Sequence, residues 1–310
     1  RSCPLLGDVL DVVAASRSDV TDTVRTARAL DAALEEAGRL GAMLEPDDST
    51  SELRRLNEEA AEGSFLCTDD LFAVLESAKE LAAETDGAYD PTAGALARLW
   101  SGRGGREEPE RADVSDARGA VGWRMLLLDP ERRGVRFTRP GPVVAPGSAA
   151  TGYVLDRAAE TLRRHGVVRA KLAIGDEVLA FTTREAWPVR LPGLDGRPAI
   201  CIALSNAACA IAAAGTAGVP AVIDPRTGQT VRGRVAVTVV ARTASRAGPL
   251  AAALLVLGRD AATAYARTHP ETGVLWLEPA GDPESVRAWA WNLGAIEPEP
   301  GMRVEWMARP

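Results

Sequence analysis

Two tight turns, far apart along the chain, constrain its fold more than any other feature. One runs Thr-Asp-Gly-Ala-Tyr-Asp-Pro over residues 85–91, and the other runs Ile-Asp-Pro-Arg-Thr-Gly over residues 223–228. Glycine accepts positive φ angles, and an aspartate side chain closes a turn by accepting backbone N–H groups. Both stretches lie between apolar segments, so each is predicted to reverse the chain sharply between elements of regular structure.

Helices and strands alternate around these turns without a regular order. Apolar residues recur at helical spacing over residues 20–45 and 69–85, and shorter helices are predicted over 154–165, 249–258 and 283–292. Because the order follows no strict βαβ rhythm, the sequence predicts an α+β fold with mixed sheets flanked by helices. The predicted strands cover residues 10–15, 123–128, 134–137, 171–174, 178–181, 199–204, 207–212, 234–241, 273–277 and 303–307.

No repeat or clean linker divides the 310 residues. We therefore expect one domain over residues 1–310, which is within the length that a single core can serve. Residues 101–118 are polar, charged and rich in glycine, and they predict a flexible surface loop.

Charge and hydropathy exclude several classes of protein. The net charge is −7 and the isoelectric point is about 5.2, so the chain lacks the basic footprint of a nucleic-acid-binding protein. No apolar run reaches the roughly 18–20 residues that a membrane-spanning helix needs, so no transmembrane segment is predicted. The four cysteines form no Cys-x-x-Cys pair and only two histidines are present, which argues against a zinc cluster.

Several motifs resemble, in order, those of the ApbE-type flavin transferases, which move FMN from FAD onto a hydroxyl of a target protein. Residues 85–92 differ from the family's Thr-Asp-Gly-Ala-Phe-Asp-Pro-Thr only at Tyr89, and residues 224–228 match its Asp-Pro-Arg-Thr-Gly. The pattern around residues 152–156 and the Gly-Asp at 175–176 also match. The resemblance covers residues 10–258. It implies an ApbE-like fold in which two lobes surround a dinucleotide pocket.

The resemblance also implies FAD, or another flavin or nucleotide, as the ligand of that pocket. For some of the implied residues a structural role stays open: Ser51 is a good helix N-cap, Asp224 a good turn former, and Tyr153 a core residue. The implied ligand-site residues are Ser51, Glu52, Asn57, Asp86, Gly87, Tyr89, Gly152, Tyr153, Asp156, Gly175, Asp176, Asp224, Thr227 and Gly228.

The chain departs from the family where the chemistry is expected. Ala221 stands at the position of the family's catalytic histidine, so no catalytic residue is assigned. The family's metal ligands are an Asp and a Thr four residues apart on a helix, and these positions are Gly248 and Ala252. Neither offers the hard side-chain oxygen that Mg²⁺ prefers, so no Mg²⁺ site is expected. Thr151 replaces a lysine, and Ala213 and Ala214 replace a Thr-Ser pair.

Two functions follow from these motif matches and departures. The first is a degenerate ApbE-fold protein that lacks efficient Mg²⁺-dependent FMN transfer and acts as a flavin or nucleotide binder or as a scaffold for a protein partner. The alternative is an active FAD:protein FMN transferase that uses substitute residues, for which Asp156, Asp176, Asp224 and His269 are candidates.

The cellular location stays open at this stage. Many ApbE-type proteins are lipoproteins anchored through an N-terminal cysteine, so Cys3 is a candidate anchor. The resemblance thus implies a cell-envelope location on the periplasmic side, with a cytoplasmic location as the alternative.

Overall fold

A nine-stranded sheet forms the centre of the computed structural model, which describes residues 1–15, 20–101, 108–194, 196–214, 222–282 and 285–308. Every neighbouring pair of strands is antiparallel except β13 and β15, which are parallel. The strands lie in the order β1 (Ser2–Leu5), β2 (Asp8–Ala14), β6 (Arg169–Ile174), β7 (Glu177–Thr182), β10 (Ala207–Ala214), β11 (Val235–Ala241), β12 (Gly273–Pro279), β13 (Ser285–Trp291) and β15 (Arg303–Ala308).

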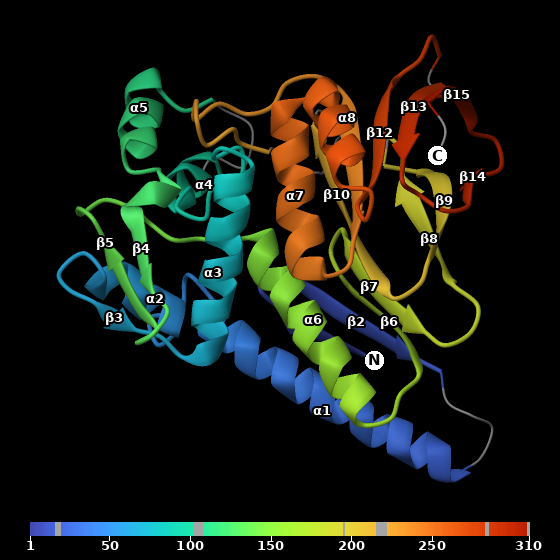
Figure 1. Ribbon diagram of the computed structural model, residues 1–310, viewed down its shortest axis with the longest axis horizontal. Coiled ribbons are helices and arrows are strands. Elements are labelled where there is room, and N and C mark those ends of the chain that lie inside the picture. The colour runs from blue at the N-terminus through green and yellow to red at the C-terminus, as the bar shows by residue number, and fades with distance from the viewer. Residues whose placement is uncertain (16–19, 102–107, 195, 215–221, 283–284, 309–310) are drawn as a thin grey trace.

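Helices cover one face of this sheet. Figure 1 shows α6 and α7 side by side against the strands, with α1 running beneath them. Alternate strand residues such as Leu179 and Phe181 join the helices in the larger core, as the two-residue period of a strand requires. The covering helices are α1 (Val20–Leu44), α6 (Ser148–Arg164), α7 (Ala244–Leu257) and α8 (Arg259–Thr268), and α3 (Asp69–Glu84) packs against α6 and α7.

A small sheet covers the other face. It has the strand order β14 (Ile296–Pro298), β9 (Pro198–Leu204) and β8 (Trp187–Pro192). Its Ile200 and Ile202 pack with Ala180, Leu275 and other inward residues of the large sheet to form a second core. The central strands are therefore buried on both faces, which explains why β10 reads as a continuous apolar run.

A third group of elements lies beside the helices, on the left in Figure 1. It contains the sheet β3 (Phe65–Leu66), β5 (Gly134–Phe137) and β4 (Leu126–Asp129). Around this sheet lie α2 (Glu52–Glu59), α4 (Gly94–Ser101), α5 (Arg111–Gly119) and the short 3-10 helix η1 (Trp123–Met125). Together the three groups confirm the α+β fold of mixed sheets flanked by helices.

Three predicted segments were wrong in whole or in part. Residues 123–125, predicted as the start of a strand, form the 3-10 helix η1. Residues 111–119 form α5 and not a loop, while residues 102–107 lie outside the described part of the chain. The helix predicted over 283–292 is strand β13. Within it Val286, Ala288 and Ala290 are buried while Arg287 is exposed, which is the two-residue alternation of a strand.

Two helix starts and two helices were also missed. Helices α6 and α7 begin six and five residues before their predicted starts at residues 154 and 249, and α4 and α8 were not predicted. Within the described residues, no helix is long and apolar enough to cross a membrane.

Candidate functional site

The structure places the two turns that dominate the sequence next to each other. Asp86 and Gly87 adopt positive φ angles of 46° and 75°. A methyl group built on Gly87 would lie 3.6 Å from Trp123 Cδ1 and 3.9 Å from Arg226 Cγ. The turn that ends α3 therefore contacts the turn at residues 223–228, although more than 130 residues separate them in the chain.

The turn at residues 223–228 is closed by its own aspartate. Asp224 Oδ1 accepts hydrogen bonds from the backbone N–H and the Nε of Arg226, both at 2.9 Å. Gly228, with a φ of 74°, donates its N–H to the Asp224 carbonyl at 2.7 Å, and the Thr227 hydroxyl lies 3.5 Å from the same carbonyl. Gly228 also packs tightly on α5, because an added methyl group would lie 2.8 Å from Val114 Cγ1. These contacts give Asp224 the turn-forming role.

The segment that leads into α6 is held by two side chains from other elements. Asn57 donates from Nδ2 to the Val144 carbonyl at 2.9 Å and accepts from the Val144 N–H at 2.7 Å. The buried Tyr89 hydroxyl donates to the Pro146 carbonyl at 2.8 Å. Burial raises the pKa of Tyr89, so the phenol stays a neutral donor. Both residues thus fix the approach to α6.

Ser51 and Glu52 stabilise the starts of α2 and α3. Ser51 is the N-cap of α2, where its Oγ accepts from the Arg54 N–H at 3.0 Å. The Glu52 carboxylate accepts from the N–H and the hydroxyl of Thr68, the N-cap of α3, at 2.6 and 2.7 Å. The structure thus gives Ser51 the capping role that the sequence left open.

Gly152 and Asp156 join α6 to the start of α7. A methyl group built on Gly152 would lie 2.4 Å from the Ala244 carbonyl group and from the Ser245 nitrogen, so only glycine permits this approach. Asp156 accepts hydrogen bonds from the N–H groups of Ala244 and Ser245 at 2.8 and 3.0 Å. Tyr153 points elsewhere and donates to Asp70 Oδ1 at 2.7 Å.

The first turn of α6 uses most of its free N–H groups itself. Ala149 donates to the Pro146 carbonyl, and Ala150 and Thr151 donate to the Gly147 carbonyl, over 2.9–3.3 Å. A helix start binds an anion through unpaired N–H groups. This turn therefore has little spare donor capacity for a phosphate, and Thr151 supplies a hydroxyl where the family has a lysine.

Glu177 is a site residue that sequence reasoning missed. It begins β7 directly after the exposed turn residues Gly175 and Asp176, and its side chain is buried. Thr151 Oγ1 donates to Glu177 Oε1 at 2.7 Å. Burial raises the pKa of the Glu177 carboxyl to about 8; the Thr151 hydrogen bond opposes this, and the charges of Asp156 and Asp176 add to it. A lone Glu ahead of the apolar Val-Leu-Ala-Phe of β7 was the available signal.

The Glu177 carboxyl lies against α7 at Gly248. A methyl group built on Gly248 would lie 2.7 Å from Glu177 Oε1 and 2.8 Å from Ser148 Cβ. Ala252 follows one turn later on the same helix. The two helix positions that the resemblance implies as metal-ligand positions thus offer no side-chain oxygen here, but a carboxyl group from β7 lies beside the first of them.

The other residues singled out from the sequence lie apart from this cluster or outside the described residues. Ala221 lies outside the described residues. His269 ends α8 and stacks on Tyr265 with ring centroids 4.0 Å apart, and its Nε2 lies 3.9 Å from Glu84. Cys3 lies partly buried in β1, opposite Leu10 of β2.

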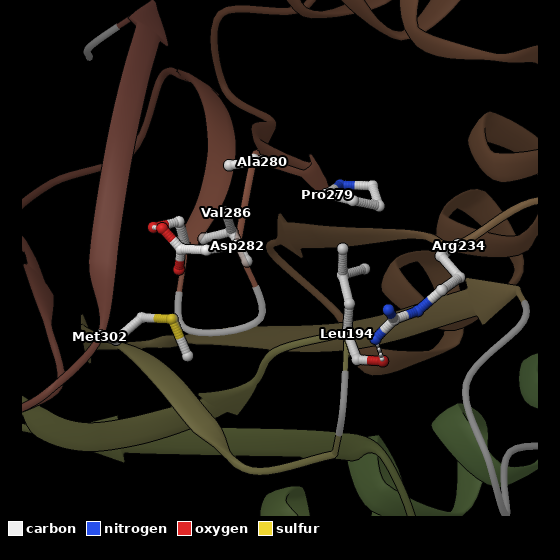
Figure 2. A pocket seen from close by; sticks show the side chains of 9 residues that line it. Leu194, Arg234, Pro279, Ala280, Asp282, Val286 and Met302 are labelled. Carbon is white, nitrogen blue, oxygen red and sulfur yellow. Dashed lines mark hydrogen bonds between the residues drawn. The ribbon is translucent and has the colours of Figure 1, made fainter.

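A separate cavity of about 230 Å³ lies at the ends of β12 and β13 (Figure 2). Arg234 borders it and donates to the Leu194 carbonyl at 3.3 Å, while Asp282 and Met302 face it from the other side. None of the predicted ligand-site residues lines this cavity.

Comparison with known proteins gives one consistent result. The model of the ApbE family matches residues 10–276. The FAD:protein FMN transferase of Vibrio cholerae is 27% identical over 286 residues, covering 86% of this chain and 84% of the relative. That of Treponema pallidum is 26% identical over 292 residues, covering 82% and 79%.

Solved structures agree with the sequence matches. The flavin transferase ApbE from Vibrio cholerae superposes with a TM-score of 0.78 at 24% identity, covering 94% of this chain and 96% of that one. The ApbE protein from Thermotoga maritima superposes with a TM-score of 0.76 at 23% identity, covering 97% and 96%. At these identities the superpositions show the shared fold. Since the family model spans most of the chain and the folds agree, this protein belongs to the ApbE family.

Proposed function

We propose that this protein is a FAD:protein FMN transferase. The observation that carries the proposal is the intact support of the segment before α6, which Asn57 and Tyr89 hold through three hydrogen bonds. Asp156 fixes the start of α7 beside it. Such contacts from distant elements preorganise a site, and preorganisation is the main requirement of phosphoryl transfer.

The reaction would proceed by exchange at phosphorus. The hydroxyl oxygen of the acceptor protein forms a bond to the phosphorus on the FMN side of the FAD diphosphate. The bond from that phosphorus to the bridging oxygen breaks, and AMP leaves with this oxygen and its electron pair. The hydroxyl proton passes to a base or to water. No base is assigned, because Ala221 stands at the family's histidine position.

Three of the four carboxyl and imidazole candidates named from the sequence are engaged in other contacts. Asp156 and Asp224 are engaged with backbone N–H groups, and His269 lies at the end of α8 with Tyr265 and Glu84. Asp176 is an exposed turn residue. Glu177, buried against α6 and α7, fits a supporting role better than any of them.

A second function is favoured by the departures at Ala221, Gly248 and Ala252. Without the family's histidine and helix oxygens, a protein with this fold would bind a flavin and present it, or a protein surface, without transferring FMN. Loss of oriented catalytic groups costs orders of magnitude in rate.

One assay separates the two functions. The purified protein is incubated with FAD, Mg²⁺ and a flavinylation target of an ApbE-family relative, and AMP release and the mass of the target are followed. We expect stoichiometric AMP and a target heavier by one FMN. A target whose acceptor hydroxyl residue is changed to alanine serves as the control. FAD binding without AMP release or a mass increase would favour a flavin-binding protein. Absence of both FAD binding and FMN transfer would favour a scaffold for a protein partner.

A further inference from the structure

We propose that Glu177, together with the hydroxyl of Thr151, forms a divalent-cation site that replaces the helix carboxylate missing at Gly248. The inference rests on the proposed function, because the cation would act on the FAD diphosphate. The proposed ligand comes from β7 and not from α7.

The Glu177 carboxyl occupies the space beside Gly248. A methyl group there would lie 2.7 Å from Glu177 Oε1 and 3.0 Å from Glu177 Cδ. Real Cβ atoms do not approach other atoms so closely, so a side chain at position 248 would require Glu177 and Ser148 to shift. The volume in which a side chain from α7 would begin is filled by a carboxyl group from β7.

The two side chains, Glu177 and Thr151, have the chemistry of ligands for a divalent cation. A carboxylate and a threonine hydroxyl are hard oxygen donors of the kind that Mg²⁺ and Mn²⁺ prefer. The family supplies one Asp and one Thr from a single helix. Here Glu177 and Thr151 supply the same two chemical groups from β7 and α6, with their oxygens 2.7 Å apart.

The second carboxylate oxygen of Glu177, Oε2, indicates that a ligand binds here. The residue is only 8% exposed, and within the described part of the chain Glu177 Oε2 is buried without a hydrogen-bond partner. Buried carboxylate oxygens are normally satisfied, because leaving one without a partner costs about 1–3 kcal/mol or more. A cation bound at Oε2 would remove this cost.

The surrounding charge favours a cation as well. The charged groups that act most strongly on Glu177 are Asp156 and Asp176, and both are acidic. The family's lysine is Thr151 in this chain, so that position adds no positive charge. A FAD diphosphate placed nearby would add further negative charge. A divalent cation between the diphosphate and Glu177 would offset both.

One carboxylate does not make a complete protein cage. Among the described residues, no group of three His, Cys, Asp or Glu side chains converges on one point. Mg²⁺ commonly binds through one or two carboxylates, waters and the phosphates of a substrate. We therefore expect weak cation binding to the protein alone and tighter binding when FAD is present, with equal coupling in both directions.

Binding of Mn²⁺ measured by electron paramagnetic resonance tests the site without turnover. The unaltered protein is titrated with Mn²⁺ alone and then with FAD, above the pKa of Glu177, and FAD without protein is the blank. We expect one Mn²⁺ per chain, bound more tightly with FAD. Glu177→Gln, which keeps the size of the side chain, should weaken binding by at least about tenfold. Thr151→Val should weaken it less.

The matched control is Asp260→Asn, which removes an equal charge from a fully exposed side chain and should leave Mn²⁺ binding unchanged. Thermal unfolding with and without Mg²⁺ gives a second measurement, since a ligand of the native state raises the melting temperature. The Mg²⁺-dependent increase should vanish in Glu177→Gln. Equal Mn²⁺ affinity of Glu177→Gln and the unaltered protein, or no response to either cation, would overturn the site and make Glu177 a neutral packing group.

This result is independent of the transfer assay. A protein that binds Mn²⁺ through Glu177 but never transfers FMN contradicts the proposed function alone. A protein that transfers FMN while Glu177→Gln binds Mn²⁺ normally contradicts the cation site alone.

Discussion

Gly152→Ala is expected to destabilise the protein by about 3 kcal/mol or more, or to prevent folding. The added methyl group would lie 2.4 Å from the Ala244 carbonyl carbon and oxygen and from the Ser245 nitrogen. These are backbone atoms of α7, so no side chain can turn aside to make room. Helices α6 and α7 must separate, and the buried apolar side chains between them lose contact.

Gly38→Ala provides the opposite control. Gly38 is an exposed position of α1, and a methyl group there would meet nothing within 4 Å. Because alanine is favoured over glycine in a helix by about 1 kcal/mol, this variant should be more stable than the unaltered protein. Urea unfolding followed by circular dichroism measures both variants. Similar changes for Gly38 and Gly152 would contradict the close approach of α6 and α7.

Asp156→Ala is expected to cost about 3 kcal/mol, because a partly buried carboxylate accepts two hydrogen bonds from the first N–H groups of α7. Its loss leaves these N–H groups without their acceptor. Since Gly248 lies one turn further along α7, the variant should also shift the α7 surface that faces Glu177 and weaken Mn²⁺ binding in the presence of FAD.

Asp156→Asn separates charge from geometry. Its amide keeps one acceptor oxygen but turns a donor toward the second N–H group, so the loss of unfolding free energy should be intermediate. Hydrogen exchange of the Ala244 and Ser245 amides should rise in both variants, and more in Asp156→Ala. Unchanged exchange at these two amides would contradict the capping role.

The elements with strong periodicity could be predicted from the sequence. Helices α1 and α3 each place one apolar stripe on the core, and their observed ends lie within one residue of the predicted ones. The buried strands β10 and β11 were recognisable for a related reason, because apolar runs bounded by turns indicate strands covered on both faces.

Two elements with a weak apolar pattern could not be predicted in this way. Helix α5 buries only Val114, which packs on Gly228 from a distant turn, so its own sequence reads as a polar loop. Strand β13 carries large apolar side chains, Trp289 and Trp291, at half-buried positions. They obscure the alternation of apolar and polar residues that is typical of a strand.

The candidate site shows the same limit. Motif matching located the turns and the segment around residues 152–156, but most of the matched residues make contacts that hold the backbone. Glu177 belongs to no motif, and its contacts with α6 and α7 become evident only when these helices and β7 are packed together. Gly248 on α7 has no side chain, and the Glu177 side chain on β7 lies beside it. The two residues are adjacent in space but about seventy residues apart in the chain.

The two edges of the nine-stranded sheet are formed by β1 and β15, one from each end of the described chain. An open edge is a template on which another molecule can add a strand. Here one edge strand has only four residues, and the other carries the charged side chains of Arg303 and Glu305. Both features disfavour strand addition. The ends of the described chain thus protect the longer strands β2 and β13 from pairing between molecules.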